Sequence, residues 1–294
     1  MSPRIVAFGE LLWDLLPSGA QLGGAPANFA LRAQGVGCKV SLVTRIGNDA
    51  YGKEALATLK TLGLDTSCVQ IDERLPTGTV DVQLSEQGNA SYHIVKNVAY
   101  DHIALVPELE ELSSTVDLIC FGTLSQRALV SRSTLYSFIE MCPRAIKLVD
   151  INLRKECYSP ETVRRSLELS DILKLNSDEV TPVCSALGIP ELTVEQFCEY
   201  MFEKFSLTHV LVTRGAQGVY GGAASGERVD IQGYAVDVVD TIGSGDAFTA
   251  GFVSGLLTGV PFSESCDFGN RLGAAVATKK GGMSPCSTAE ARAL

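Results

Sequence analysis

Residues 118–151 read LICFGTLSQRALVSRSTLYSFIEMCPRAIKLVDI and contain one complete strand–helix–strand unit. Leu118–Phe121 and Ile146–Ile151 are mostly apolar, which is typical of parallel strands covered on both faces. Between them, Ser131–Met141 repeats apolar residues at helical spacing. A helix between two parallel strands of one sheet forms a right-handed crossover, so this stretch predicts an α/β fold.

The same alternation continues on both sides of this unit. Further buried strands are expected at Ile5–Phe8, Ile172–Leu175 and Val210–Val212. A helix is expected over Thr193–Phe205, because its first residue and Gln196 are spaced as a capping box. We therefore predict one domain over residues 1–294, with three α-β-α layers around a mostly parallel central sheet.

One stretch departs from this alternation. Residues 77–98 hold two segments of alternating apolar and polar residues around the polar turn Glu86–Asn89, which is a hairpin pattern. Leu11–Leu16 is a candidate strand of the same sheet. We expect a small β-sheet lid that is discontinuous in sequence, from about 11–22 and 66–100. The alternative is an edge hairpin that takes no part in a site.

Composition argues against several classes of protein. The formal net charge is −10, from 24 Lys and Arg against 34 Asp and Glu, whereas a nucleic-acid binder needs a basic face. No apolar stretch approaches the roughly 20 residues that span a bilayer, so no membrane association is expected. The nine cysteines include no C-x-x-C pair and the three histidines are isolated. We therefore expect reduced thiols in a cytoplasmic protein, and no zinc site.

Polar residues follow most of the expected strands. In open α/β sheets, ligands bind beyond the carboxyl ends of the strands. The polar residues and the glycine found at these ends are Asp14, Asp150, Asn152, Arg154, Asn176, Glu179, Thr213, Gly215 and Asp240. Because the ends of parallel strands lie on the same edge of the sheet, we expect these residues to converge on one site.

The segment Asp240–Phe248 reads DTIGSGDAF and predicts an anion site. We expect a strand over Tyr234–Val239 before it and a helix that begins near Asp246. Gly243–Gly245 is a turn of small residues, so its amides and those of the first helical turn are open to a phosphate group. A carboxylate beside that anion is placed to take a proton from an attacking hydroxyl. The alternative is that this Asp only caps the helix.

A second glycine-rich segment, Gly23–Asn28, reads GGAPAN and leads into a helix expected over Ala27–Gly35. Its paired glycines allow a ligand to approach the backbone closely. Asn28 offers both a donor and acceptors. This arrangement suits the hydroxyl groups of a polyol.

Together the two segments resemble the signatures of the ribokinase-like, or PfkB, family of carbohydrate kinases, and within it those of fructokinase-like members. Residues 23–52 (GGAPANFALRAQGVGCKVSLVTRIGNDAYG) are similar to the first signature, and residues 240–252 (DTIGSGDAFTAGF) to the second. The similarity extends from Gly9 to Gly282. It implies a ribokinase-like fold and a kinase that transfers the γ-phosphate of ATP to a sugar hydroxyl in the presence of Mg²⁺. Since lid sheets in this family often pair, it also implies a homodimer through the lid.

The resemblance assigns roles to individual residues. Asp246 corresponds to the catalytic base, and the anion hole corresponds to Gly243, Ser244 and Gly245. The residues that correspond to the sugar site are Asp14, Gly24, Asn28 and Arg154. The residues on the nucleotide side are Asn176, Thr213, Gly215, Gly218 and Asn270.

The resemblance also implies two cation sites. Glu179 is expected to hold Mg²⁺ through water, since Mg²⁺ keeps several of its waters. A monovalent cation such as K⁺ is expected near Asp240 and Ile242. Two positions depart from the family pattern: Ser244 stands where Ala is frequent, and Arg214 stands where a small or apolar residue is common.

Rival functions lack their own signatures in this chain. A nicotinamide dehydrogenase needs G-x-G-x-x-G after the first strand, and a P-loop kinase needs G-x-x-x-x-G-K-[ST]. Neither pattern is present where it is needed. A non-catalytic sugar-binding regulator on the same fold is expected to lose Asp246 or a glycine of the turn, and this chain keeps both. Among substrates, fructose is favoured, and 2-keto-3-deoxygluconate, other ketoses and nucleosides stay open.

Overall fold

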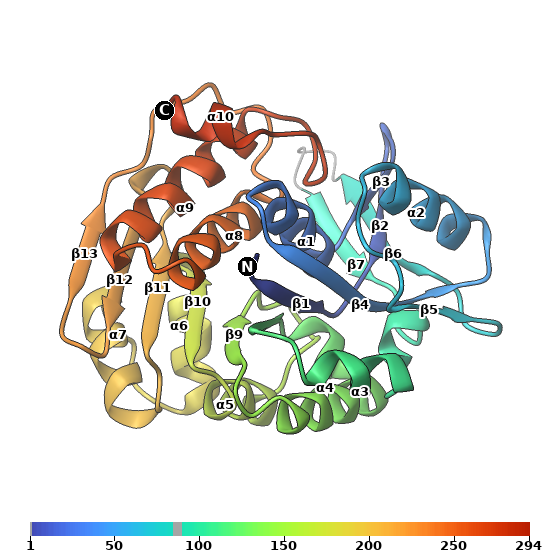
Figure 1. The fold of residues 1–294 in the computed structure, drawn as a ribbon, viewed down its shortest axis with the longest axis horizontal. Coiled ribbons are helices and arrows are strands. Elements are labelled where there is room, and N and C mark those ends of the chain that lie inside the picture. The colour runs from blue at the N-terminus through green and yellow to red at the C-terminus, as the bar shows by residue number, and fades with distance from the viewer. Residues whose placement is uncertain (1, 85–89) are drawn as a thin grey trace.

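A nine-stranded sheet forms the middle layer of the computed structural model, which describes residues 2–84 and 90–294 (Figure 1). Its order is β13-β12-β11-β10-β9-β8-β1-β4-β5. Each adjacent pair from β11 to β5 is parallel, while β12 is antiparallel to both of its neighbours, β11 and β13. The strands are β1 (Arg4–Phe8), β4 (Lys39–Gly47), β5 (Val69–Asp72), β8 (Leu118–Phe121), β9 (Ile146–Asp150), β10 (Ile172–Asn176), β11 (His209–Thr213), β12 (Val219–Ala223) and β13 (Arg228–Ile231).

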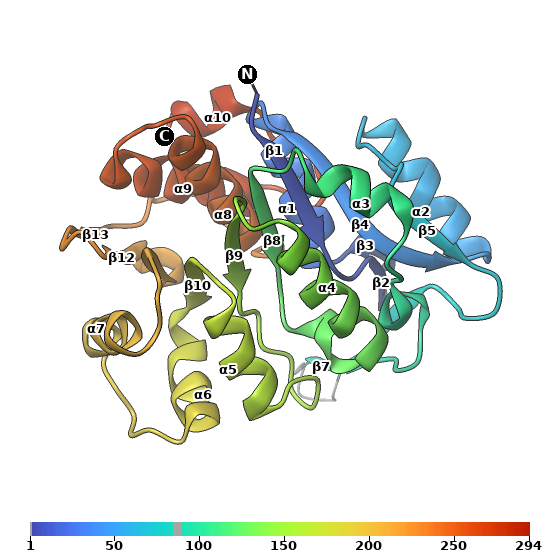
Figure 2. The ribbon, with the colours of Figure 1, turned by 60° about the horizontal axis from the view of Figure 1, so that its bottom comes forward.

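Helices cover both faces of this sheet and bury a separate apolar core on each (Figure 2). One face carries α3 (Pro107–Ser113), α4 (Leu129–Met141), α5 (Pro160–Glu168), α6 (Ser177–Leu187) and α7 (Val194–Lys204). The other carries α1 (Ala25–Gly35), α2 (Ala50–Thr61), α8 (Ser244–Leu257) and α9 (Phe262–Ala277), and α10 (Thr288–Arg292) packs on α9. The predicted three-layer α/β class is confirmed.

The expected elements of the sheet layers are present with small shifts of their ends. The capping box before α7 is confirmed, because the amide of Gln196 donates to Thr193 Oγ1 at 3.3 Å and the amide of Thr193 donates back to Gln196 Oε1 at 3.1 Å. Short 3₁₀ helices lie at Ala99–His102, Leu124–Arg127 and Gly215–Gln217. No helix in the described part of the chain is long and apolar enough to cross a membrane.

The strand expected over Tyr234–Val239 is wrong. This segment forms no strand and is not paired with the sheet, and Val239 is 63% exposed. Its last amides are bonded elsewhere: those of Val239 and Asp240 donate to the carbonyl of Ala277, at the end of α9, at 2.9 and 3.2 Å. An alternating pattern makes a strand only where its backbone groups pair with a neighbouring strand. Here the chain leaves β13, the last strand of the sheet, to reach the start of α8, and its amides bond to the end of α9 instead.

A second, four-stranded sheet has the order β3-β2-β6-β7. Its strands are β2 (Leu12–Leu16), β3 (Gly19–Gly23), β6 (Gly78–Leu84) and β7 (Ala90–Ile94). The antiparallel pairing of β6 with β7 and the strand at Leu12–Leu16 confirm the expected elements, and the expected turn Glu86–Asn89 lies outside the described residues. Within the expected lid segment 66–100, β5 must be excluded, because it pairs with β4 in the large sheet.

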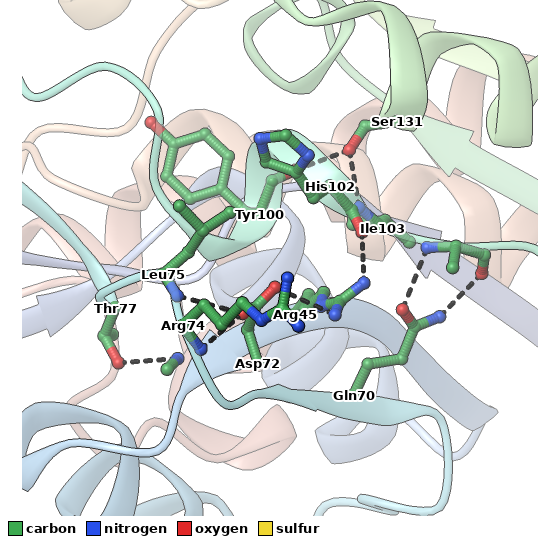
Figure 3. A network of polar contacts seen from close by, with 12 residues as sticks. Arg45, Gln70, Asp72, Arg74, Leu75, Thr77, Tyr100, His102, Ile103 and Ser131 are labelled. Carbon is green, nitrogen blue, oxygen red and sulfur yellow. Dashed lines mark hydrogen bonds and ion pairs between the residues drawn. The ribbon is translucent and has the colours of Figure 1, made fainter.

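A buried polar network fixes the segment that connects the two sheets (Figure 3). Asp72, at the end of β5, accepts the amides of Arg74 and Leu75 at 2.9 Å each, and forms an ion pair with Arg45 at 2.8 Å. Arg45 also donates to the carbonyl of His102 at 2.7 Å. This region, which we call the lid root, thereby ties β4 to the chain that leads into β6.

Candidate active site

The N-terminus of α8 lies where the sequence predicts the anion site. Gly243 caps the helix with a left-handed φ of 80°, and α8 begins slightly before the start expected near Asp246. The amide of Ser244 donates to the carbonyl of Thr241 at 3.2 Å. In the described part of the chain, the amides of Gly245 and Asp246 have no hydrogen-bond partner. Both amides are therefore open to a phosphate oxygen.

Close neighbours explain why the turn is built from glycines. A Cβ on Gly243 would lie 2.8 Å from Gly282 Cα, and a Cβ on Gly245 would lie 2.9 Å from Lys174 Nζ. The Lys174 ammonium group therefore lies directly behind the turn. Between the two glycines, the hydroxyl of Ser244 is buried without a partner among the described residues, so the departure from Ala adds a polar group to the hole.

Asp246 is held next to Asn28, which the sequence placed in the sugar site. Asn28 Nδ2 donates to Asp246 Oδ2 at 2.9 Å, and the two residues lie 218 positions apart in the chain. Burial, together with the negative charge of Asp150, raises the pKa of Asp246 to about 6. Lys174, the bond from Asn28 and Arg154 oppose this rise. The carboxylate is thus ionised at neutral pH and basic enough to accept a proton.

A buried ion pair between Lys174 and Asp150 lies next to the anion turn. Lys174 Nζ contacts both oxygens of Asp150, at 3.1 and 2.9 Å, from adjacent parallel strands. Thr249 Oγ1 donates to Asp150 Oδ2 at 3.2 Å and to the carbonyl of Gly245 at 3.0 Å. No sequence motif assigns a role to Lys174. The signal that could have revealed one is a lone charge inside the otherwise apolar run ILKL of β10.

The sugar side of the site is built from the start of α1 and the first strands. Gly24 has a φ of 115°, and a Cβ on it would lie 2.4 Å from the backbone oxygen of Glu10, so only glycine fits. Asp14 on β2 is half-buried, and burial raises its pKa while Arg154 lowers it. Arg154 is exposed, and it acts on the carboxyls of Asp14, Glu10 and Asp246 alike. The structure thus brings the predicted sugar residues around the predicted base.

Two further buried charged residues lie at the site: Glu10, which follows the first strand and to which the sequence assigned no role, and Arg32, which sequence reasoning missed. Glu10 is 3% exposed, its Oε2 has no hydrogen-bond partner within the described residues, and burial raises its pKa to about 7. Arg32 on α1 is also 3% exposed, and its Nη2 donates to the carbonyl of Gly282 at 2.6 Å. Arg32 lies within the first signature segment, residues 23–52, but no role was inferred for it, and Glu10 precedes that segment.

Asn176 and Glu179 lie at the ends of the strands but bond to the backbone. They form the capping box of α6, with the amide of Glu179 donating to Asn176 Oδ1 at 3.1 Å and the amide of Asn176 donating to Glu179 Oε2 at 2.9 Å. The amide of Leu153 donates to Glu179 Oε1 at 2.7 Å. Asn176 is exposed and stands opposite Thr213 on β11. These residues border the same sheet edge as Lys174.

The predicted nucleotide loop follows β11. Gly215 and Gly218 have φ of 57° and 83°, and a Cβ on Gly218 would lie 2.0 Å from the carbonyl oxygen of Ile231. Arg214 forms an ion pair with Asp230 on β13. The unusual arginine is therefore part of the sheet edge.

Asn270 is buried on α9, and its Nδ2 donates to the carbonyl of Gln232 at 2.7 Å. This bond ties α9 to the chain that follows β13. Asn270 therefore fixes the position of that chain whether or not it also borders a nucleotide.

The carboxylates predicted to hold cations already accept hydrogen bonds from the backbone. The described residues contain no group of three or more His, Cys, Asp or Glu side chains that could hold a metal by themselves. A single carboxylate such as Glu179 is compatible with a Mg²⁺ ion that keeps most of its waters. Asp240 accepts the amide of Ile242 at 3.0 Å and that of Gly281 at 2.9 Å, which leaves further lone pairs on both oxygens.

Known proteins match this chain over nearly its whole length. The model of the pfkB family carbohydrate kinases matches residues 19–289. The fructokinase of Escherichia coli is 29% identical over 97% of both chains, and that of Klebsiella pneumoniae is 30% identical over 96% of both.

Solved structures share the fold. A fructokinase with bound ATP from Xylella fastidiosa has a TM-score of 0.86 and 21% identity, over 100% of this chain and 98% of its own. A fructokinase from Vibrio cholerae O395, in fructose, ADP and calcium ion bound form, has a TM-score of 0.84 and 25% identity, over 99% of this chain and 98% of its own. The chain belongs to the pfkB family of carbohydrate kinases and is a sugar phosphotransferase.

Proposed function

We propose that this protein transfers the γ-phosphate of ATP to a hydroxyl of a small ketose, with fructose as the preferred substrate. The observation that carries the proposal is the position of Asp246, which is bonded to Asn28 at the start of a helix whose first amides are open. The relatives from E. coli and K. pneumoniae that are named fructokinases support fructose, as does the V. cholerae structure with fructose and ADP.

The sugar binds between the start of α1 and the small sheet. The Asp14 carboxylate and the Asn28 side chain bond to sugar hydroxyls, and Gly24 lets the ring approach the backbone. The Oδ1 of Asn28 is buried without a partner among the described residues, which fits an acceptor waiting for a hydroxyl. Arg154 balances the negative charge of the surrounding carboxyls.

Asp246 acts as the general base. It accepts the proton of the sugar hydroxyl, whose oxygen forms a bond to the γ-phosphorus while the bond from that phosphorus to the ADP oxygen breaks. The turn Gly243, Ser244 and Gly245 and the first amides of α8 stabilise the charge on the transferring group, with the Lys174 ammonium group behind them. Placement and charge stabilisation are most of what phosphoryl transfer requires.

The nucleotide lies along the ends of β10 and β11. Its phosphates lie next to Asn176 and Thr213. The rest of the nucleotide lies along the loop with Gly215 and Gly218 and extends towards Asn270. Mg²⁺ neutralises phosphate charge when it is bound, and Glu179 holds it through water. Asp240 and Ile242 hold a monovalent cation next to the anion turn.

The small sheet acts as a lid that closes over the sugar and excludes water, which limits hydrolysis of ATP. Its segments are 11–22 and the part of 66–100 that follows β5. A homodimer through this sheet stays a prediction. The nine cysteines are free and all but Cys286 are buried, which suits the reducing cytoplasm that we propose as its compartment.

A coupled assay of ADP release over a panel of sugars tests the proposal. The panel contains fructose, other ketoses, 2-keto-3-deoxygluconate and nucleosides. We expect the highest kcat/KM with fructose. The Asp246→Asn variant should release ADP only at a small fraction of the wild-type rate. A higher value for 2-keto-3-deoxygluconate would replace fructose as the substrate, whereas sugar binding by calorimetry without any ADP release would identify a regulator.

A further inference from the structure

The turn at Gly281–Gly282 connects the two halves of the site. The amide of Gly281 donates to Asp240 Oδ2 at 2.9 Å, on the cation side. Gly282 Cα lies only 2.8 Å from the place that a Cβ on Gly243 would take, behind the anion turn. A Cβ on Gly282 itself would lie 2.7 Å from the side chain of Asn28, on the sugar side. The turn therefore lies close to Asp240, to the anion turn and to Asn28 at once.

Arg32 holds this turn from α1. Its Nη2 donates to the carbonyl of Gly282 at 2.6 Å, across 250 positions of sequence. Arg32 follows Asn28 by one helical turn, so the same face of α1 presents the residue that bonds to Asp246 and the residue that bonds to Gly282. The clamp and the catalytic carboxylate are thus positioned by one rigid element.

The burial of Arg32 is costly and is not offset by an ion pair. The guanidinium group is 3% exposed, it forms no salt bridge in the described part of the chain, and its Nε has no hydrogen-bond partner there. Burial lowers its pKa, and the Asp246 carboxylate, which forms no salt bridge with it, opposes this shift. A buried charge without such a partner destabilises the fold, so its presence indicates a use in the site.

We propose that Arg32 is a positioning residue of the kinase reaction, which clamps the Gly282 turn against Gly243 and so keeps the anion hole in register with Asp246. The proposal rests on the proposed function, since it concerns the same site. Without the clamp, the turn moves away from Gly243 and the open amides of α8 lose their alignment to the transferring phosphoryl group. The sugar contacts at Asp14 and Gly24 do not depend on it.

Kinetics of Arg32→Ala and Arg32→Lys test the clamp. We expect kcat of Arg32→Ala to fall about 10²-fold, which is the cost of a misplacement of about 1 Å, while KM for sugar and for ATP stays within about threefold. Millimolar guanidinium should restore part of the activity of Arg32→Ala. Arg45→Ala is the matched control, because Arg45 also donates to a backbone carbonyl at 2.7 Å but lies in the lid root, and its kcat should stay within about twofold of wild type.

Hydrogen exchange gives a readout that needs no turnover. We expect Arg32→Ala, or Arg32→Lys if the alanine variant does not fold, to lose protection in peptides that cover 278–284 and 240–246, with no change at the lid root. Near-normal kcat with unchanged hydrogen exchange would overturn the proposal. So would a loss of kcat that guanidinium does not restore and that is not accompanied by a loss of protection at 278–284 and 240–246. Wild-type protein that releases no ADP with any sugar would contradict the proposed function alone, because the exchange comparison still decides whether Arg32 holds the turn.

Discussion

The lid root and the active site are both buried polar networks, and they differ in how completely their charges are partnered. In the lid root, each carboxylate oxygen of Asp72 has a hydrogen bond or an ion pair. Although burial opposes ionisation, the amides of Leu75 and Arg74 and the Arg45 guanidinium group hold the pKa of Asp72 below its ordinary value. Arg45 Nε is an exception, since it has no partner among the described residues.

In the active site the same kinds of groups are left incomplete. Glu10 Oε2, Asn28 Oδ1 and Ser244 Oγ are buried without partners among the described residues, and burial raises the pKa of Glu10 and of Asp246. A buried group that the protein does not satisfy is one that a ligand can satisfy. The comparison predicts that substitutions in the lid root reduce stability, while substitutions of incomplete groups in the site reduce activity.

The largest expected effect is that of Asp246→Asn. Loss of a general base lowers kcat by about 10²–10⁴-fold. Stability should not fall, because burial raises the pKa of Asp246 to about 6, so that its ionisation at neutral pH destabilises the folded state relative to the unfolded chain. Steady-state kinetics and thermal unfolding at about pH 7.5 check both halves. A variant with near-normal kcat, or one that unfolds more easily than wild type, contradicts the division between the two networks.

Lys174→Met tests the one part of the active site that is fully paired. Asp150 would stay buried without its cation, which typically costs about 3–5 kcal/mol of unfolding free energy. Activity should also fall at acidic pH, since Lys174 lowers the pKa of Asp246. Urea unfolding measures the first effect.

The exposed pair Arg165–Glu168 supplies the control for Lys174→Met. Both of its side chains are 44% exposed, so Arg165→Met should cost less than about 1 kcal/mol. Equal losses for Lys174→Met and Arg165→Met would show that the buried pair does not stabilise this strand edge.

Asp72→Asn tests the lid root. Removal of the charged acceptor leaves the Arg45 guanidinium group partly unsatisfied, so the free energy of unfolding should fall by about 1–3 kcal/mol with kcat within about twofold of wild type. The pKa of Asp72 is lowered on folding, so its contribution is present above the unfolded pKa of about 3.9 and is lost as pH falls through the folded value. The difference between variant and wild type in urea unfolding should therefore shrink in acid. A large fall in kcat would assign the lid root to the chemistry.

Most of the fold could be predicted from the sequence because its signals are local. The apolar runs of β8, β9 and β10 and the capping box of α7 are each contained in a few residues. The segment Tyr234–Val239 has the same kind of pattern, yet whether it pairs depends on the position of β13 and on the carbonyl of Ala277. Such long-range competition leaves no mark in the local sequence.

The site divides in the same way. Asp246 and its glycine turn form one short segment, so their chemistry could be inferred together. Arg32 acquires its role only through Gly282, at the far end of the chain, and Glu10 through its burial beneath Gly24. Lys174 is an intermediate case. A lysine in a buried strand predicts that an acidic partner is present, but the local sequence does not show which residue that partner is.

Activity and stability should have opposite pH dependences. The base must be ionised, so kcat/KM should fall about tenfold per pH unit below the pKa of Asp246 of about 6. Stability should change in the other direction. The pKa values of Asp246 and Glu10 are raised on folding, from 3.8 and 4.5 to about 6 and about 7, so their contribution to stability is complete below the unfolded values and is lost as pH rises through the folded ones.

Glu10→Gln separates these two dependences. Thermal unfolding of Glu10→Gln should match wild type near pH 4 and exceed it increasingly up to about pH 7, because the variant has no carboxyl to ionise there. The acid limb of its kcat/KM profile should stay near the pKa of Asp246 of about 6, because Glu10 is mostly protonated at that pH and the substitution removes no charge there. Asp72→Asn should not show this gain in stability. If Glu10→Gln loses stability evenly at every pH, the Glu10 carboxyl is a satisfied structural group, and the active site is more like the lid root than its unpartnered atoms indicate.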